Sequence, residues 1–179
     1  MIESKTKKVN MSFGALYNYV INTNYKNFSG VISLGLSFVA AVVLVVKWDE
    51  LSNGHRVSFA IIALLFTVIN PLMLAFRTYK QFKLSNSYKE PLEYTFADSG
   101  ITVKQGELEQ ELKWKNICRI MMTGKILAIY TSRIHAFVIP LSELGNDKGK
   151  ILAAVVQFTA EYKPKVSKSL REFQSGKGI

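Results

Sequence analysis

Strongly hydrophobic, uncharged residues occupy two blocks of the chain. Residues 28–46 and residues 57–76 contain no Asp, Glu, Lys or Arg, and each block is close to the about 20 residues that cross the hydrocarbon core of a bilayer. We therefore predict two membrane-spanning helices that form a hairpin. The Asn70-Pro71 step should kink the second helix, because proline lacks a backbone donor and membrane helices tolerate the resulting break.

Two other interpretations of these blocks are disfavoured. A cleaved signal peptide would need a short leader and a small-x-small cleavage site, whereas the polar leader is long, no such site follows Val46 and a second hydrophobic block comes next. Core helices of a soluble protein would show a polar face, which neither block has.

Small side chains recur every three or four residues in each predicted span, and this spacing predicts that the helices pack closely on each other or on a second copy. Chance is the alternative, because small residues are common in membrane helices. The residues are Ser29, Ser33, Ser37 and Ala41 in the first span and Ala60, Ala63, Thr67 and Pro71 in the second.

Lysine and arginine flank the spans more densely than they occupy the loop between them. By the positive-inside rule this distribution predicts that both termini are cytoplasmic, in a multi-pass protein of the cell (cytoplasmic) membrane. The flanking residues are Lys5, Lys7, Lys8 and Lys26 before the first span and Arg77, Lys80, Lys83 and Lys89 after the second, against Lys47 and Arg56 in the loop.

An amphipathic helix is predicted within the N-terminal segment, residues 1–27. Its apolar positions follow helical spacing, and Ser12 is available as the N-cap. The opposite face carries no lysine, so adsorption to lipid and packing against the rest of the protein both remain open. The apolar residues are Phe13, Leu16, Tyr17, Val20 and Ile21.

Apolar and polar residues alternate after Pro91, which is typical of β-strands. Six short runs separated by turn residues predict an antiparallel sheet curled toward a barrel. A helix with apolar positions between Ile151 and Tyr162, capped by Asn146 or Asp147, should cover one end of the sheet. The runs are residues 92–96, the stretch from Ile101 until Gly106 interrupts it, and residues 107–114, 117–122, 126–131 and 134–139.

The predicted organisation therefore has five parts. A membrane hairpin joins a small soluble domain through a basic linker, and a basic tail rich in Gly and Ser is expected to be disordered. The boundaries are residues 1–27 for the N-terminal segment, 28–76 for the hairpin, 77–91 for the linker, 92–162 for the domain and 163–179 for the tail.

The net charge of +10 lies almost wholly outside the hydrophobic blocks. A basic surplus beside membrane spans indicates topology and contact with anionic lipid headgroups. Nucleic acid is not an expected partner, because the sequence shows no zinc-finger, RNP or helix-turn-helix spacing. Cys118 is the single cysteine, so an intrachain disulfide is excluded, and we expect it to be a small core residue.

Candidates for catalysis or metal binding are few. His55 lies in the loop between the spans, while Cys118 and His135 belong to different strands, and we expect His135 to be half-buried. Glu107, Glu109 and Glu111 alternate along one strand, which predicts a solvated acidic face. No P-loop, GxGxxG, HExxH or CxxC motif occurs, so we expect no enzyme activity, catalytic residue, cofactor or metal.

Several turn and core residues follow a recognisable order. Gly100-Ile101, Gly106, WKNI at residues 114–117 and Ile139-Pro140 resemble the YcxB-like family of bacterial membrane proteins. This resemblance implies a membrane location and a C-terminal domain similar to a bacterial pleckstrin-homology (PH)-type barrel. It implies no activity. The family tends to place a basic residue after the proline, where this chain has Leu141-Ser142-Glu143, so the resemblance supplies no cationic site there.

Our functional hypothesis is a non-enzymatic membrane protein whose cytoplasmic PH-like domain binds a protein partner or lipid headgroups. Lys80, Lys83 and Lys89 are the candidate contacts to anionic lipid, and setting topology is their alternative role. Homo-oligomerisation is also open. The alternative function is an accessory subunit of a membrane transport or enzyme complex, although Asn70 is the only strongly polar side chain within the spans.

Trp114 is predicted to face the core because it lies in line with Leu108 and Leu112. An exposed aromatic platform for a partner is the alternative interpretation.

Overall fold

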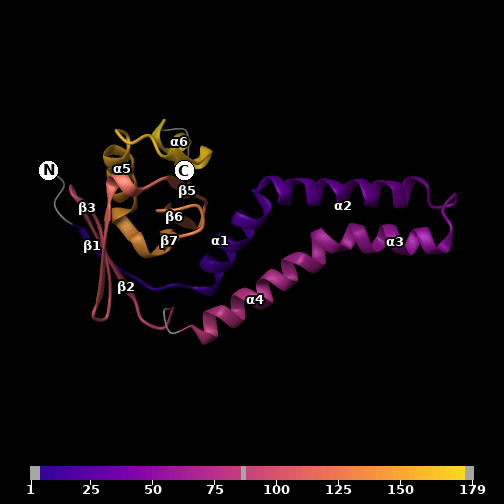
Figure 1. The fold of residues 1–179 in the computed structure, drawn as a ribbon, viewed down its shortest axis with the longest axis horizontal. Coiled ribbons are helices and arrows are strands. Elements are labelled where there is room, and N and C mark those ends of the chain that lie inside the picture. Colours follow the sequence, from indigo (N-terminus) through magenta and orange to yellow (C-terminus); the bar gives the residue numbers. More distant parts are fainter. Residues whose placement is uncertain (1–4, 86–87, 176–179) are drawn as a thin grey trace. The chain divides into compact units, whose positions relative to one another are not determined.

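The computed structural model describes residues 5–85 and 88–175 and contains two compact units. The helical unit is Tyr17–Phe82. The strand-rich unit combines the described residues up to Leu16 with those from Lys83 onward. The strand-rich unit is therefore discontinuous in sequence, with the helical unit inserted into it (Figure 1).

Both predicted spans are helices. Helix α2 is Phe28–Val46, as expected, and a second continuous helical stretch covers Asn53–Leu84. That stretch contains α3 (Asn53–Leu64), the π-helical turn η1 (Leu65–Ile69) and α4 (Asn70–Leu84). It is longer than the predicted 57–76, so much of the expected 77–91 linker is helical.

The second helix bends where proline was expected to kink it, as the change of direction between α3 and α4 shows (Figure 1). The Asn70 amide donates to the Leu65 carbonyl, a bond five residues back that defines a π turn. The next residue, Pro71, has no amide hydrogen, so the same pattern leaves the Phe66 carbonyl without a backbone donor from position 71. The bend therefore has an identifiable cause.

Helices α2 and α3 pack on each other through small residues. The Ser37 hydroxyl donates to the Ile62 carbonyl at 2.9 Å. Ser37 is fully buried and Ala40 is 3% exposed. Of the predicted small residues, Ser37 makes this contact, whereas Ser29 and Thr67 are exposed, and Ala40 lies outside the predicted set.

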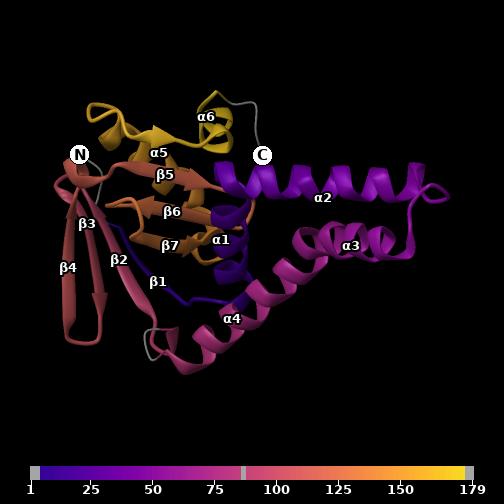
Figure 2. The same ribbon diagram turned by 45° about the vertical axis from the view of Figure 1, so that its right-hand side comes forward.

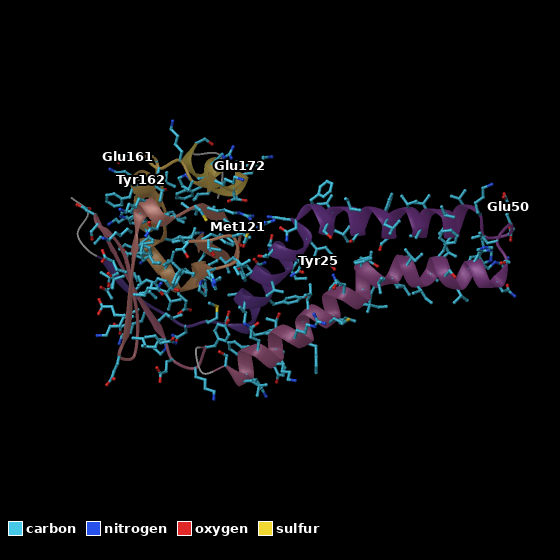
Figure 3. The ribbon with its side chains drawn as sticks, viewed as in Figure 1. Tyr25, Glu50, Met121, Glu161, Tyr162 and Glu172 are labelled. Carbon is cyan, nitrogen blue, oxygen red and sulfur yellow. The ribbon has the colours of Figure 1, made fainter. Side chains whose placement is uncertain are left out.

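Helix α1 (Phe13–Tyr25) is the predicted amphipathic helix. The Ser12 hydroxyl accepts from the Ala15 amide at 3.2 Å, which confirms the expected N-cap. Within the helical unit, the Tyr25 hydroxyl donates to the Phe66 carbonyl at 2.7 Å, and Figure 3 shows this side chain directed toward the bend. Tyr25 thus supplies the donor that Pro71 cannot.

Two sheets form the strand-rich unit, and their strands run in clearly different directions (Figure 2). The first has the order β1-β2-β3-β4 and the second the order β7-β6-β5-β8. All neighbours are antiparallel except β5 and β8. The strands are β1 (Lys5–Val9), β2 (Leu92–Ala97), β3 (Gly100–Gln105), β4 (Leu108–Lys113), β5 (Arg119–Met122), β6 (Ile126–Tyr130), β7 (Ala136–Pro140) and β8 (Lys165–Val166).

The six predicted strands are confirmed, but the expected single sheet curled toward a barrel is wrong. Within the part of the chain that the structure describes, the two sheets do not close into a barrel. The 3₁₀ turn η3 (Trp114–Asn116) separates β4 from β5, so the chain turns a corner there and β5 begins a second sheet.

The tail expected to be disordered is ordered over most of its length. Strand β8 and helix α6 (Lys168–Gln174) lie within it. Leu170 is fully buried, and Phe173 packs against the core. These two residues are spaced three apart on one helical face, which anchors an otherwise charged segment. Residues 176–179 lie outside the described part.

Helix α5 (Lys148–Thr159) supplies the expected cover, with Ile151, Leu152 and Val155 buried. The 3₁₀ segment η4 (Leu141–Asp147) precedes it. Asp147 occupies the N-cap position without capping through its side chain. It forms instead an ion pair with Lys7 of β1 at 2.7 Å.

Trp114 lies in the core, as predicted. It is 4% exposed, its ring stacks on Phe158 at 5.2 Å between centroids, and its indole N–H donates to the Ala97 carbonyl at 3.0 Å. Leu108 does not share this environment, because it is 77% exposed near the start of β4. Leu112, near the other end of the strand, is 4% exposed and belongs to the core cluster that contains residues of both sheets.

Candidate functional site

The three lysines predicted to contact lipid are not grouped in one place. Lys80 and Lys83 lie on α4, one helical turn apart, and both are exposed. Lys89 is also exposed but follows residues 86–87, which the structure does not describe. The structure therefore assigns a regular helical position only to the first two.

The continuation of α4 fixes how far these charges lie from the hydrophobic stretch. The helix has no break between Phe76 and Leu84. At a rise of about 1.5 Å per residue, Lys80 lies about 6 Å and Lys83 about 10 Å beyond Phe76 along the axis. For comparison, the headgroup region of a bilayer adds roughly 5–8 Å on each side of the hydrocarbon core, a distance that includes Lys80 but ends short of the Lys83 backbone position.

The strand-rich unit contains a second cationic feature, which we call the lysine groove. It comprises a hollow of about 480 Å³ and a second hollow of about 500 Å³, and both are lined by Gly124, Leu141 and Lys148. The first hollow is also lined by Ser12, Gly14, Ala15, Lys125, Pro140 and Ser142, and the second by Met122, Thr123, Gly149, Ser169, Glu172 and Phe173.

Local hydrogen bonds fix the floor of the lysine groove. The Thr123 hydroxyl accepts from the amides of Lys125 and Ile126, both at 3.2 Å. The Leu141 amide donates to the Lys125 carbonyl at 2.9 Å. These bonds hold the turn between β5 and β6 against the start of η4.

The charged lining residues of the groove are Lys125 and Lys148 in the first hollow and Lys148 and Glu172 in the second, and two helix starts border the first hollow. Lys148 is the first residue of α5, and Ser12 caps α1. Among the described residues neither Lys125 nor Lys148 forms an ion pair. Helix N-termini carry partial positive charge, so the groove can accommodate an anionic group.

Sequence reasoning missed the lysine groove. The family resemblance drew attention to the position after Pro140, where this chain has Leu141-Ser142-Glu143 in place of a basic residue. The positive charge comes instead from Lys125 and Lys148, which the fold brings to the same surface. No local motif links these positions.

The predicted chemistry candidates are separated. His55 lies at the start of α3, where its Nδ1 is 2.8 Å from the Ser52 hydroxyl. Cys118 is exposed, so its assignment to the core is wrong. His135 is exposed and not half-buried. Among the described residues no three His, Cys, Asp or Glu side chains form a cluster that could hold a metal ion.

Asn70, the polar side chain within the spans, has a structural partner. Its amide group donates to the Tyr25 hydroxyl at 3.0 Å. Asn70 and Tyr25 therefore form a short chain of hydrogen bonds that ends on the Phe66 carbonyl at the bend.

The residues that carry the family resemblance have structural reasons to be where they are. A Cβ at Gly100 would lie 2.4 Å from the Leu112 carbonyl oxygen, and Gly106 has φ +57° in the β3–β4 turn. Glycine meets both demands, because it has no Cβ and readily adopts positive φ.

Comparison with known proteins identifies one match. The family model described as YcxB-like protein matches residues 96–153, from the end of β2 into α5. No curated protein and no solved structure matches the chain.

Proposed function

Because residues 96–153 are a YcxB-like segment, we propose that the chain is a non-enzymatic integral membrane protein whose strand-rich unit is a PH-like interaction module at the membrane surface. In this proposal α2 and the Asn53–Leu84 helix cross the bilayer. The module binds lipid headgroups or a protein partner. The mechanism is to hold a binding surface at the membrane.

The exposed apolar surface of the two long helices carries the proposal. Only 11% of the most hydrophobic window of each helix is buried, which argues against core helices of a soluble domain. Phe28 is 84% exposed, Phe38 is 69% exposed and Phe76 is 71% exposed. Apolar patches this extensive are unfavourable in water, and a lipid environment removes that cost.

Strand pairing supports an even number of membrane crossings. Strand β1 precedes both helices, β2 follows them, and the two strands pair from Lys5↔Phe96 to Val9↔Leu92. Paired strands must lie in one compartment. The lysine and arginine distribution favours the cytoplasm for that compartment.

The arrangement of the strand-rich unit suits a PH-like module. Strands β1 to β7 form two sheets of antiparallel pairs, and α5 follows them. Its surface carries the lysine groove, which has the charge needed for an anionic group.

The positions of Lys80 and Lys83 support direct contact with anionic headgroups, each contributing about 1 kcal/mol. The test uses the full chain in an uncharged detergent, titrated with dioleoylphosphatidylglycerol and, separately, with dioleoylphosphatidylcholine. We expect tighter binding of the anionic lipid. Combined Lys80→Gln, Lys83→Gln and Lys89→Gln should weaken it by about 100-fold, because three such contacts amount to about 3 kcal/mol.

A matched control separates specific contact from general charge. Combined Lys115→Gln, Lys150→Gln and Lys163→Gln removes the same charge at exposed positions and should leave the affinity within about threefold. Equal weakening in both triple variants would contradict the assigned contacts.

Topology has its own test. A reporter fused after Ile179 should be active only as a cytoplasmic protein, and one inserted near Asn53 only as an exported one. Export of the Ile179 fusion would contradict the orientation.

A further inference from the structure

The outer edge of β4 is an unpartnered sheet edge beside an apolar hollow. Strand β4 is last in the order β1-β2-β3-β4, and no described strand pairs with its outer side. Six residues, Leu108–Lys113, form this edge. Such an edge presents backbone donors and acceptors that a further strand can use.

Charged residues form an alternating row across the exposed face of this sheet. Lys8 is opposite Glu93, Glu93 is opposite Lys104, and Lys104 is opposite Glu109. Lys8 and Glu93 form an ion pair at 3.0 Å. The row ends on an acidic residue at the open edge, so the next position in the row favours a basic residue, because opposite charges directly across strands are stabilising.

A second row leads to the same requirement. Thr6, Thr95 and Thr102 lie opposite one another in turn, and Thr102 is opposite Glu111 on β4. Glu109 and Glu111 are therefore two residues apart on the same exposed face. An added strand would need basic residues at two alternate positions.

The intervening positions of an added strand would face an apolar hollow of about 430 Å³. Its apolar lining residues are Leu92, Val103, Phe137 and Leu108, the last of which is 77% exposed, and Gln105, Glu109 and Gln110 complete the lining. This hollow favours apolar side chains between the basic ones.

We propose that the outer edge of β4 binds an extended segment of a partner protein in which basic residues alternate with apolar ones. The segment adds a fifth strand, its basic side chains face Glu109 and Glu111, and its apolar side chains enter the hollow beside Leu108. A second copy of this chain is a poorer occupant, because symmetric pairing of two β4 strands would place Glu109 opposite Glu111. This surface is separate from the lysine groove, and its use does not depend on lipid binding.

The test measures fluorescence anisotropy of labelled peptides with the full chain in an uncharged detergent. The probe is the peptide Lys-Val-Lys-Val-Lys-Val-Lys. A second peptide, Lys-Lys-Lys-Lys-Val-Val-Val, has the same composition without the alternation. We expect the alternating peptide to bind about tenfold tighter or more, because only it can meet both charge rows and the hollow. Equal affinities would overturn the proposal.

Two variants locate the site. Combined Glu109→Lys and Glu111→Lys should weaken binding of the alternating peptide by about tenfold or more. Combined Glu161→Lys and Glu172→Lys (both labelled in Figure 3) makes the same change of net charge at residues outside β4, just after α5 and on α6, and should change affinity by less than about threefold. Equal weakening in both would show general charge attraction and overturn the proposal.

Two further measurements keep the proposal testable if the combined Glu109→Lys and Glu111→Lys variant fails to fold. Leu108→Ser alters an exposed side chain and should still weaken binding by about threefold or more. Hydrogen exchange of amides 108–113 should slow when the alternating peptide binds. Protection confined to other segments, or no loss with Leu108→Ser, would overturn the proposal.

Discussion

Large apolar side chains have opposite environments in the two units. In the helical unit, Phe28 is 84% exposed and Phe38 is 69% exposed, whereas Tyr94 and Phe96 of the strand-rich unit are at most 2% exposed. The buried residues of the helical unit include the small or polar Ser37, Ala40 and Thr78 besides Leu74. One chain therefore contains two packing schemes, and under the proposed function the first faces lipid and the second faces water.

Polar groups follow the same division. In the helical unit, side-chain hydroxyls donate to helix carbonyls, from Ser37 to Ile62 and from Tyr25 to Phe66. In the strand-rich unit, charged and hydroxyl side chains face each other across strands, as Lys8 and Glu93 do. Hydrogen bonds to carbonyls are valuable where water is absent. Exposed ion pairs contribute little in water.

Trp114→Ala should produce the largest effect, and it tests the hydrophobic core of the strand-rich unit. Removing a buried tryptophan costs about 3–5 kcal/mol, and this one also stacks on Phe158 and bonds to Ala97. In the full chain in detergent, hydrogen exchange should accelerate across 92–140, while 28–84 stays protected. As the control, Leu108→Ala at a 77% exposed position should change little. Unchanged exchange in Trp114→Ala would contradict the core role.

Leu170→Ala tests whether the tail belongs to that core. Leu170 is fully buried, so its truncation should cost about 2–4 kcal/mol of unfolding free energy. Urea unfolding followed by Trp114 fluorescence is the measurement. Lys168→Ala on the same helix, whose side chain is 90% exposed, should stay within about 0.5 kcal/mol. If both substitutions lowered the unfolding free energy by a similarly small amount, the tail would not be part of the core.

Tyr25→Phe tests the hydrogen bonds at the bend of the helical unit. The substitution keeps the ring but removes the donor to Phe66 and the acceptor for Asn70. The expected cost is about 1–3 kcal/mol, because polar groups lose partners away from water. Thermal unfolding followed by helical circular dichroism is the measurement. Tyr162→Phe, at a 46% exposed position of the strand-rich unit, is the control, and equal shifts would show that the bend does not depend on Tyr25.

Ser37→Ala should have the smallest effect. It preserves close packing of α2 on α3 and removes only the bond to the Ile62 carbonyl. Such bonds average about 0.6 kcal/mol in membrane helices. Ser37→Leu should be far more disruptive, because a bulky side chain does not fit a fully buried position. If Ser37→Leu were tolerated in the same unfolding assay, the close contact between the helices would be refuted.

Much of the fold followed from local pattern. The first span, the six strands from Leu92 to Pro140 and the cover helix have strong periodicity, so sequence predicted them. Strand β1 was missed because Lys5–Val9 contains a single apolar residue. Its partner β2 follows the helical unit in the sequence, and local periodicity cannot predict pairing between such distant segments.

The candidate sites were less predictable. Lys80 and Lys83 were recognisable from charge beside a span. Lys125 and Lys148 gain their shared groove only through the fold. Alternation along β4 correctly predicted that its glutamates are exposed. It did not predict that Leu108, on the opposite face, is also exposed, because that depends on how the two sheets pack.

The pairing of β1 with β2 also has a consequence for synthesis. Val9 leaves the ribosome long before Leu92, its partner across the strands. At about 5–20 residues per second, β1 waits on the order of ten seconds. During this interval the nascent strand has an unpaired edge, and its three lysines, Lys5, Lys7 and Lys8, help to keep such an edge from aggregating. The strand-rich unit can be completed only after the helical unit has been made, so an arrest of synthesis within the helical unit would leave β1 without its partner.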